Sequence, residues 1–106
     1  MRAGSLGVRL TLERPVRTPD GAGGATIAWT AVTGLWGELR PLSGRERTGA
    51  GGRLSDVTHD ITLRHRAGVL PEMRLVAGSR VFGILAVLDD EAGRRLVCHC
   101  REEVRA

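Results

Sequence analysis

The chain has 106 residues and a formal charge of +4, and all 16 of its basic residues are Arg. This length fits one domain, residues 1–106, with no room for a second core. The basic balance favours a polyanionic partner, but one Phe, two Trp and no Tyr argue against a protein that reads single-stranded nucleic acid by base stacking.

The two cysteines, Cys98 and Cys100, are separated by one residue near the C-terminus. In a strand they would point to the same face and could not easily bridge each other, so we expect no disulfide framework. Residues 1–8 lack the apolar segment of a signal peptide, and the longest apolar stretch, residues 81–88, is too short to span a bilayer. These features predict a reducing cytoplasmic compartment and no membrane partner.

Alternation of apolar and polar residues predicts strands at the start of the chain. Apolar residues alternate with polar ones from Val8 to Leu12, and Pro15 is expected to end this strand. A turn-rich loop at residues 18–24 then leads into a second strand at residues 25–32. We therefore expect two short strands joined by a loop.

A third strand is predicted at residues 35–40, between a kink at Gly34 and Pro41. Residues 42–54 then change character, because they hold four Gly and three Arg and almost nothing apolar. A segment this long and glycine-rich predicts a mobile, projecting loop. It is either a solvated surface loop or an element that reaches a polyanion or a neighbouring subunit, and the candidates for that contact are Arg45, Arg47 and Arg53.

The second half of the chain repeats the strand pattern. Strands are predicted at residues 56–66, 73–76, 80–88 and 94–104, and no segment has helical periodicity. The sequence therefore predicts an all-β fold, a small six- to seven-stranded antiparallel barrel with one long projecting Gly/Arg-rich loop. The expected core consists of Leu10, Leu12, Ile27, Leu39, Ile61, Leu63, Val81, Ile84, Val87 and Leu96.

No group of residues predicts catalysis, a metal site or a cofactor. His99 would face away from Cys98 and Cys100 in a strand, and the second ligand pair of a zinc site is missing. Ser43 and Ser55 lie in or beside the glycine-rich loop, without the turn that presents a nucleophilic serine. We expect the protein not to be an enzyme, to bind no cofactor or metal, and to use its two cysteines to fill a core face.

The order of several sequence pieces carries a resemblance to a known family. The most specific pieces are the string Trp36-x-Glu38-x-x-Pro41-x-Ser43-Gly44-x-Glu46 and the later strand Thr58-His59-x-Ile61. From Leu10 to Val104 the chain resembles the head-closure proteins (stopper, or head–tail joining proteins) of tailed bacteriophages and gene transfer agents. The further pieces are Glu13-Arg14-Pro15, Asp20-Gly21-x-Gly23-Gly24, Trp29-Thr30, Met73-Arg74, Arg80-Val81-Phe82-Gly83-Ile84 and Glu102-Glu103-Val104.

The resemblance implies a component of a virion or phage-like particle that is assembled in the bacterial cytoplasm. It implies a small β-barrel that forms a ring of six or twelve copies below the portal-side adaptor ring. Such a ring closes or gates the DNA channel after packaging and offers a docking face to the tail terminator. The loop at residues 42–54 would project toward the channel, where Arg45, Arg47 and Arg53 would contact packaged double-stranded DNA non-specifically or a neighbouring subunit.

Two residues depart from the family pattern, and two other functions stay open. Gly83 stands where the family commonly has a polar residue, and His65 where it commonly has an aromatic one, which leaves the local packing open. A basic β-barrel that binds nucleic acid would explain the charge, but it would be expected to carry aromatic residues on one sheet face. A tail-terminator-type ring protein would carry amphipathic helices, which the sequence does not predict.

Overall fold

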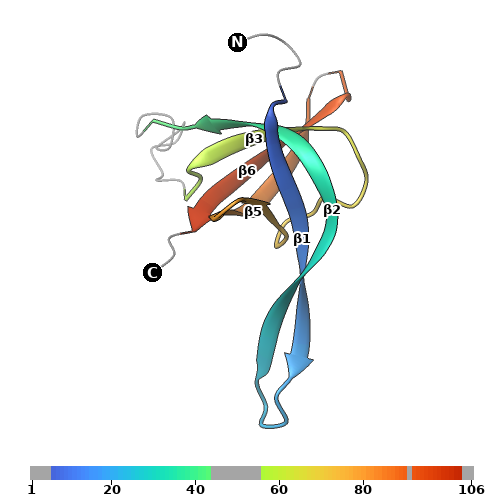
Figure 1. The fold of residues 1–106 in the computed structure, drawn as a ribbon, viewed down its shortest axis with the longest axis vertical. Coiled ribbons are helices and arrows are strands. Elements are labelled where there is room, and N and C mark those ends of the chain that lie inside the picture. The colour runs from blue at the N-terminus through green and yellow to red at the C-terminus, as the bar shows by residue number, and fades with distance from the viewer. Residues whose placement is uncertain (1–5, 44–55, 91, 104–106) are drawn as a thin grey trace.

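The computed structural model of the chain describes residues 6–43, 56–90 and 92–103. Every element in these ranges is a β-strand, and no helix there is long and apolar enough to cross a membrane. Figure 1 shows the strands wrapped into a barrel from which a two-stranded ribbon projects. The strands are β1 (Val8–Pro19), β2 (Ala25–Pro41), β3 (His59–Arg64), β4 (Arg74–Ala77), β5 (Arg80–Asp89) and β6 (Arg95–Glu103).

The six strands form a closed antiparallel barrel in the order β1-β2-β3-β6-β5-β4. The shortest pairing closes the ring, since β1 and β4 pair only through Thr11–Val76, Leu12–Leu75 and Glu13–Arg74. The prediction of an all-β, six- to seven-stranded antiparallel barrel is therefore confirmed. The predicted loop at residues 42–54, with Arg45, Arg47 and Arg53, falls almost entirely outside the described residues.

The first two strands are longer than the sequence predicts. β1 continues through Pro15 to Pro19, and β2 is a single strand that continues through Gly34. Proline lacks the N–H that a sheet interior needs, but each strand of a two-stranded ribbon has one edge toward solvent, where no donor is required. The register between β1 and β2 shifts between Leu12 and Glu13, at the point where the barrel gives way to the ribbon.

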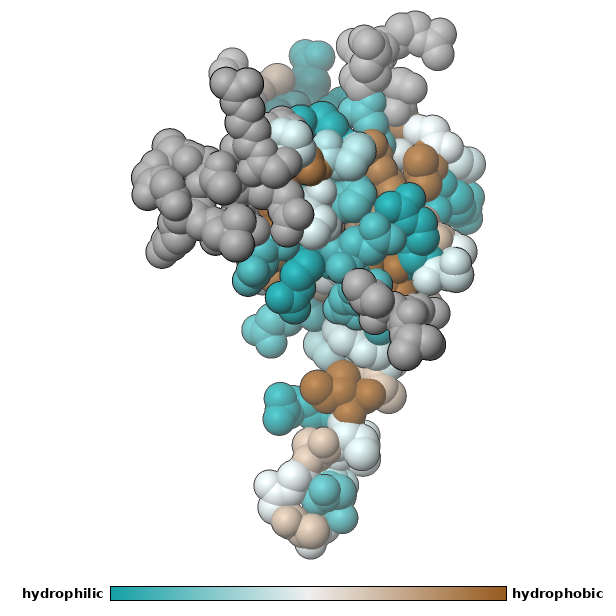
Figure 2. All heavy atoms as spheres, turned by 90° about the vertical axis from the view of Figure 1, so that its left-hand side faces the viewer, coloured by the Kyte–Doolittle hydropathy of each residue, from teal (hydrophilic) through white to brown (hydrophobic). Residues whose placement is uncertain are grey.

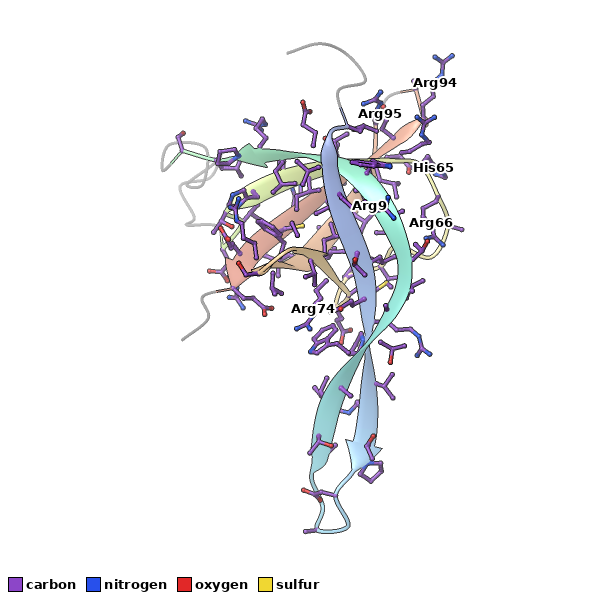
Figure 3. All side chains as sticks on the ribbon, viewed as in Figure 1. Arg9, His65, Arg66, Arg74, Arg94 and Arg95 are labelled. Atoms are coloured by element: carbon purple, nitrogen blue, oxygen red, sulfur yellow. The ribbon has the colours of Figure 1, made fainter. Side chains whose placement is uncertain are left out.

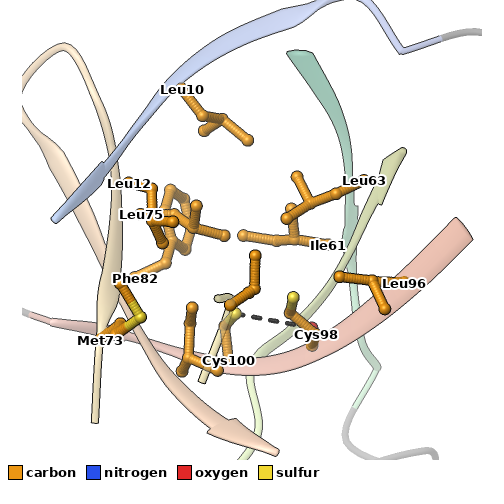
Figure 4. Packing of buried hydrophobic residues seen from close by; sticks show 12 residues of the cluster. Leu10, Leu12, Ile61, Leu63, Met73, Leu75, Phe82, Leu96, Cys98 and Cys100 are labelled. Carbon is orange, nitrogen blue, oxygen red and sulfur yellow. Dashed lines mark hydrogen bonds between the residues drawn. The ribbon is translucent and has the colours of Figure 1, made fainter. Parts of the chain in front are cut away.

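The core fills the barrel with buried side chains from β1, β3, β4, β5, β6 and the turn before β4 (Figure 4), and β2 packs the partly buried Leu35 and Leu39 against them. Seven of the ten predicted core residues are buried, and Leu39 and Val87 are partly buried against the same cluster. Ile27 is the exception, since 52% of it is exposed on the projecting ribbon. The core also includes four buried residues that the sequence did not predict, Val69, Met73, Leu75 and Phe82.

One glycine lets two strands approach across the core. Gly37 is buried, and a Cβ there would lie 2.6 Å from Leu10 Cδ1 and 2.9 Å from Leu63 Cδ2. These distances are shorter than carbon atoms tolerate, so no larger residue fits without moving two core leucines. The glycine between Trp36 and Glu38 is thus a packing requirement of the barrel.

Candidate interaction surfaces

The projecting ribbon, residues 14–31, is the most prominent surface feature and is called the arm below. Its two strands pair with each other and with no other strand of the described chain, because β4 contacts β1 only up to Glu13 and β3 contacts β2 only from Gly37. Figure 1 shows the arm running well beyond the barrel. Both of its edges therefore carry unpaired backbone groups.

The tip of the arm is an ordered turn. The Asp20 carboxylate accepts hydrogen bonds from the backbone N–H groups of Ala22 (2.8 Å) and Gly24 (3.1 Å). The Asp20 N–H in turn donates to the Gly24 carbonyl at 3.1 Å. Gly21 and Gly23 take φ values of +81° and +88°, which glycine adopts without strain. The turn at the tip is therefore stabilised by hydrogen bonds among its own residues.

The surface of the arm is short of charge. Arg14, Arg17 and Asp20 are its only ionisable residues, and the remainder is mostly Ala, Thr, Gly and β-branched or aromatic residues. Ile27 is half exposed, and Figure 2 shows the arm as mostly pale and brown, with little hydrophilic surface. A ribbon with few charges and two free edges is suited to pairing or packing with another chain. The arm therefore has the properties of a contact element.

A partly buried ion pair fixes the base of the arm to the barrel. Arg74 Nε on β4 donates to Glu13 Oε1 at 2.6 Å, and both side chains are at most 20% exposed. The same guanidinium lies over the Trp29 ring, 4.2 Å from its centroid. Because Arg74 contacts Glu13, just before the arm on β1, and Trp29, within the arm on β2, it restricts the angle at which the arm leaves the barrel.

A groove runs beside this base. It measures about 400 Å³ and includes the exposed side chains of Val32 (41% exposed) and Leu70 (59%). Glu72 in its wall takes a φ of +75°, a strained conformation for a non-glycine residue, while its N–H donates to the Ile84 carbonyl. This mostly apolar groove, next to an arm with few charges, extends the surface available for contact.

A second surface lies on the outer face of the barrel. Cross-strand register places Arg9 opposite Trp36 and Arg64 opposite Arg95. The β2–β3 register, with Gly37 opposite Leu63, carries Trp36 next to Arg64. These outward side chains form one row across four strands, called the cationic row, whose members are Arg9, Trp36, Arg64 and Arg95.

Further along the same face the charges are paired. Asp60 accepts from Arg40 at 3.0 Å and contacts His99 Nδ1 at 2.6 Å. These three side chains also sit in one row, because Asp60 lies opposite Arg40 on β2 and opposite His99 on β6. Two rows on the same sheet face therefore differ in charge. The row of Arg40, Asp60 and His99 contains a carboxylate that balances its positive charge, and the cationic row contains none.

The first residue of β3, at the end away from Arg64, is the buried His59, which lies in a polar cluster. His59 packs edge-on against Phe82, with ring centroids 5.0 Å apart. Arg80 Nη2 lies 3.4 Å from Nε2, and because arginine only donates, Nε2 accepts and Nδ1–H donates to Thr58 Oγ1 at 2.9 Å. Burial lowers the pKa of His59, opposed by Glu102 and assisted by Arg80. His59 is therefore held neutral.

The structure places Cys98 and Cys100 on the core side of β6 and His99 on its outer face. Cys98 and Cys100 lie fully buried in the core, as predicted, and burial raises the pKa of the Cys98 thiol to about 12. His99 points to the outer face instead. Within the described ranges no three His, Cys, Asp or Glu side chains are grouped to hold a metal ion. The candidate contact residues Arg45, Arg47 and Arg53 lie outside those ranges.

Comparison with known proteins places these surfaces in context. Residues 1–103 match the model of a family described as phage head completion protein. A chain from a structure of the virion of a native gene transfer agent particle is 38% identical, with a TM-score of 0.70, and the match covers 92% of this chain and 94% of the other. Protein SF1141 from Shigella flexneri 2a is 28% identical over all of both chains, with a TM-score of 0.79. No curated protein sequence matches the chain.

Proposed function

The chain belongs to the phage head completion protein family and is a structural component of a phage-type head, and from this premise we propose that it forms a ring in the head–tail connector. The ring closes or gates the DNA channel after packaging and presents a docking face to the tail. One domain, residues 1–106, carries both roles. The observation that carries the proposal is the arm, a ribbon with few charges whose free edges and exposed Ile27 favour contact with a neighbouring protein.

The parts of the chain divide these roles between them. The closed barrel supplies a rigid body, and the arm supplies contacts with the next copy, the portal-side adaptor or the tail terminator. The loop at residues 42–54 follows β2, and we propose that Arg45, Arg47 and Arg53 face the channel or the next subunit. The fastened arm base, where Arg74 binds Glu13, favours a fixed arm direction, which a closed ring requires.

Shortening the arm tests the assembly role. Replacing residues 17–27 with Asn-Gly joins Val16 to Ala28, which are already paired, through a two-residue turn. We expect a folded barrel that enters particles poorly, so that heads lose DNA and lack tails. Particles of normal composition, DNA content and infectivity or transduction would contradict the proposal.

Changing the loop tests the gate separately. Arg45→Ser, Arg47→Ser and Arg53→Ser together should leave the protein in the particle but reduce DNA retention or tail joining. The matched variant with Lys at the same three positions keeps the charge and should restore both. If the Ser variant retains DNA and joins tails as well as the unmodified protein, the loop is a solvated surface loop and the gate lies elsewhere.

A further inference from the structure

The cationic row is an unusual arrangement for a sheet surface. Arg64 and Arg95 face each other directly across β3 and β6, and like charges at such positions destabilise a sheet. Among residues 6–43, 56–90 and 92–103, no carboxylate lies within 4.0 Å of the guanidinium groups of Arg9, Arg64 or Arg95. The fold thus bears a repulsion that a bound anion would relieve.

The surroundings of the row add positive charge and a place to bind. Arg66 and Arg94 flank it, and Figure 3 shows Arg9, His65, Arg94 and Arg95 toward the same end of the barrel, away from the arm. Among the nearby carboxylates, Asp89 lies 3.4 Å from His65 and Asp90 accepts the Arg94 N–H at 3.0 Å. Glu38, two residues after Trp36 on the same face of β2, lies more than 4.0 Å from the guanidinium groups of Arg9, Arg64 and Arg95. A shallow hollow of about 550 Å³ opens at the row, lined by Leu6, Gly34, Leu35, Trp36 and Arg64.

Trp36 orients the row rather than adding to the core. The Arg9 guanidinium lies 5.2 Å from the centroid of its ring, and 52% of Trp36 is exposed. An arginine held over an aromatic face keeps its donors free and their direction restricted, which favours bidentate contacts with an anion.

The spacing of the charges favours a linear polyanion. Neighbouring strands lie about 4.8 Å apart, so the row from Arg9 on β1 to Arg95 on β6 spans roughly 14 Å. One strand of duplex DNA presents a phosphate about every 3.4 Å of its axis, so several phosphates fall along this length. An acidic protein would need several carboxylates side by side to match the same row, and the repulsion between them would destabilise that protein.

We propose that Arg9, Arg64 and Arg95, with Trp36 orienting Arg9, form a phosphate-binding surface that contacts the backbone of duplex DNA without sequence preference. This inference rests on the proposed function, because a connector component meets packaged DNA, but it assigns the contact to the barrel face and not to the loop. The contact is of the sequence-independent, salt-dependent kind.

Fluorescence anisotropy with the isolated full chain and a labelled 24-base-pair duplex tests the proposal. The unmodified protein should bind at roughly 150 mM salt with a Kd within roughly 10⁻⁴–10⁻⁶ M and more tightly at lower salt, because log affinity should fall with log salt at about −0.9 for each phosphate engaged. The variant Arg9→Gln/Arg64→Gln/Arg95→Gln should bind at least about tenfold more weakly, with a slope smaller by roughly 2–3. Its melting temperature should hold or rise, since the Arg64–Arg95 repulsion is gone.

The matched control is Arg14→Gln/Arg17→Gln/Arg101→Gln, which removes the same charge elsewhere and should keep most of the affinity and slope. Equal losses in both variants, or no salt-dependent binding by the unmodified protein, would overturn the proposal. Tighter binding to a labelled poly-glutamate peptide than to the duplex would also overturn it, in favour of an acidic protein partner. None of these outcomes depends on particle assembly, so the connector role stands or falls by the arm and loop variants.

Discussion

The barrel and the arm are built from the same two strands and yet depend on different interactions. In the barrel, β1 contributes Leu10 and Leu12 to the core, and both side chains are fully buried. In the arm the same strand has no fully buried residue, and its order comes from the hairpin register, the Asp20 turn and the Arg74 contact at the base. Most of the free energy that stabilises the fold therefore comes from apolar burial in the barrel, and the arm contributes little to it.

The sharpest test of this comparison removes one large side chain from each region. Phe82→Ala should lower the free energy of unfolding by about 3–5 kcal/mol, because Phe82 is fully buried and a cavity would remain. Ile27→Ala should change it by less than about 0.5 kcal/mol, because Ile27 is half exposed on the arm. Urea denaturation of the two variants measures both values. A large effect of Ile27→Ala in the isolated protein would contradict the conclusion that the arm contributes little to stability.

Gly37→Ala adds a single methyl group at the closest approach in the barrel. The new Cβ would overlap Leu10 and Leu63, so we expect a loss of about 1–3 kcal/mol. Gly7→Ala, where a Cβ meets nothing within 4 Å, is the matched control and should be nearly neutral. Thermal unfolding distinguishes them, since each kcal/mol corresponds to about 4–8 °C in a domain near this size. Equal melting temperatures would show that the core leucines can move aside.

Glu13→Gln should loosen the arm more than it unfolds the barrel. The change weakens the contact with Arg74, at an expected global cost of about 1 kcal/mol. Amide hydrogen exchange in residues 14–31 should accelerate, while exchange in β5 and β6 should change little. Glu103→Gln alters the charge equally on an exposed residue and serves as the control. Uniform acceleration through the whole chain would mean that arm and barrel are one cooperative unit.

Acid should weaken the barrel through His59. Its folded pKa is lowered from the ordinary value of 6.5, chiefly by burial, so below that pH the unfolded chain binds a proton more readily than the folded one. The histidine's contribution to stability is thus complete above pH 6.5 and is lost as the pH falls toward the folded pKa. The melting temperature should fall between pH 7.5 and 5, and less steeply in His59→Gln. An unchanged slope in that variant would assign the pH dependence to other groups.

The alternation of apolar residues was enough to predict the all-β barrel and most of its core. It failed at the arm, where Ile27 has the same local pattern as a core residue but lies beyond the reach of the other strands. Nothing in the sequence near Pro15 reveals that the ribbon continues, because the tolerance for proline depends on an edge that only tertiary structure creates. Phe82 and Leu75 were missed because continuous apolar runs do not distinguish faces.

The cationic row likewise could not be predicted from local sequence patterns. Arg9, Arg64 and Arg95 are far apart in the sequence, and only the strand register brings them into line. The alternation of apolar and polar residues predicts an outward position for each of the three. What it could not supply was the pairing order β1-β2-β3-β6, which makes neighbours of them.

The short seam between β1 and β4 has a consequence for how the chain folds. β1–β2, β4–β5 and β5–β6 connect strands that follow one another along the chain, whereas Thr11 must find Val76 from the other end of the sequence. Closing such a distant pair costs loop entropy before any contact offsets it, so the seam should be the last step, on the millisecond-to-second timescale of small β-barrels. Pulse-labelled hydrogen exchange during refolding should protect the β5–β6 hairpin before the Leu12–Leu75 pairing. Until the seam closes, the unpaired flank of β4 is a free edge, and newly made chains are most exposed to mispairing with one another during that interval.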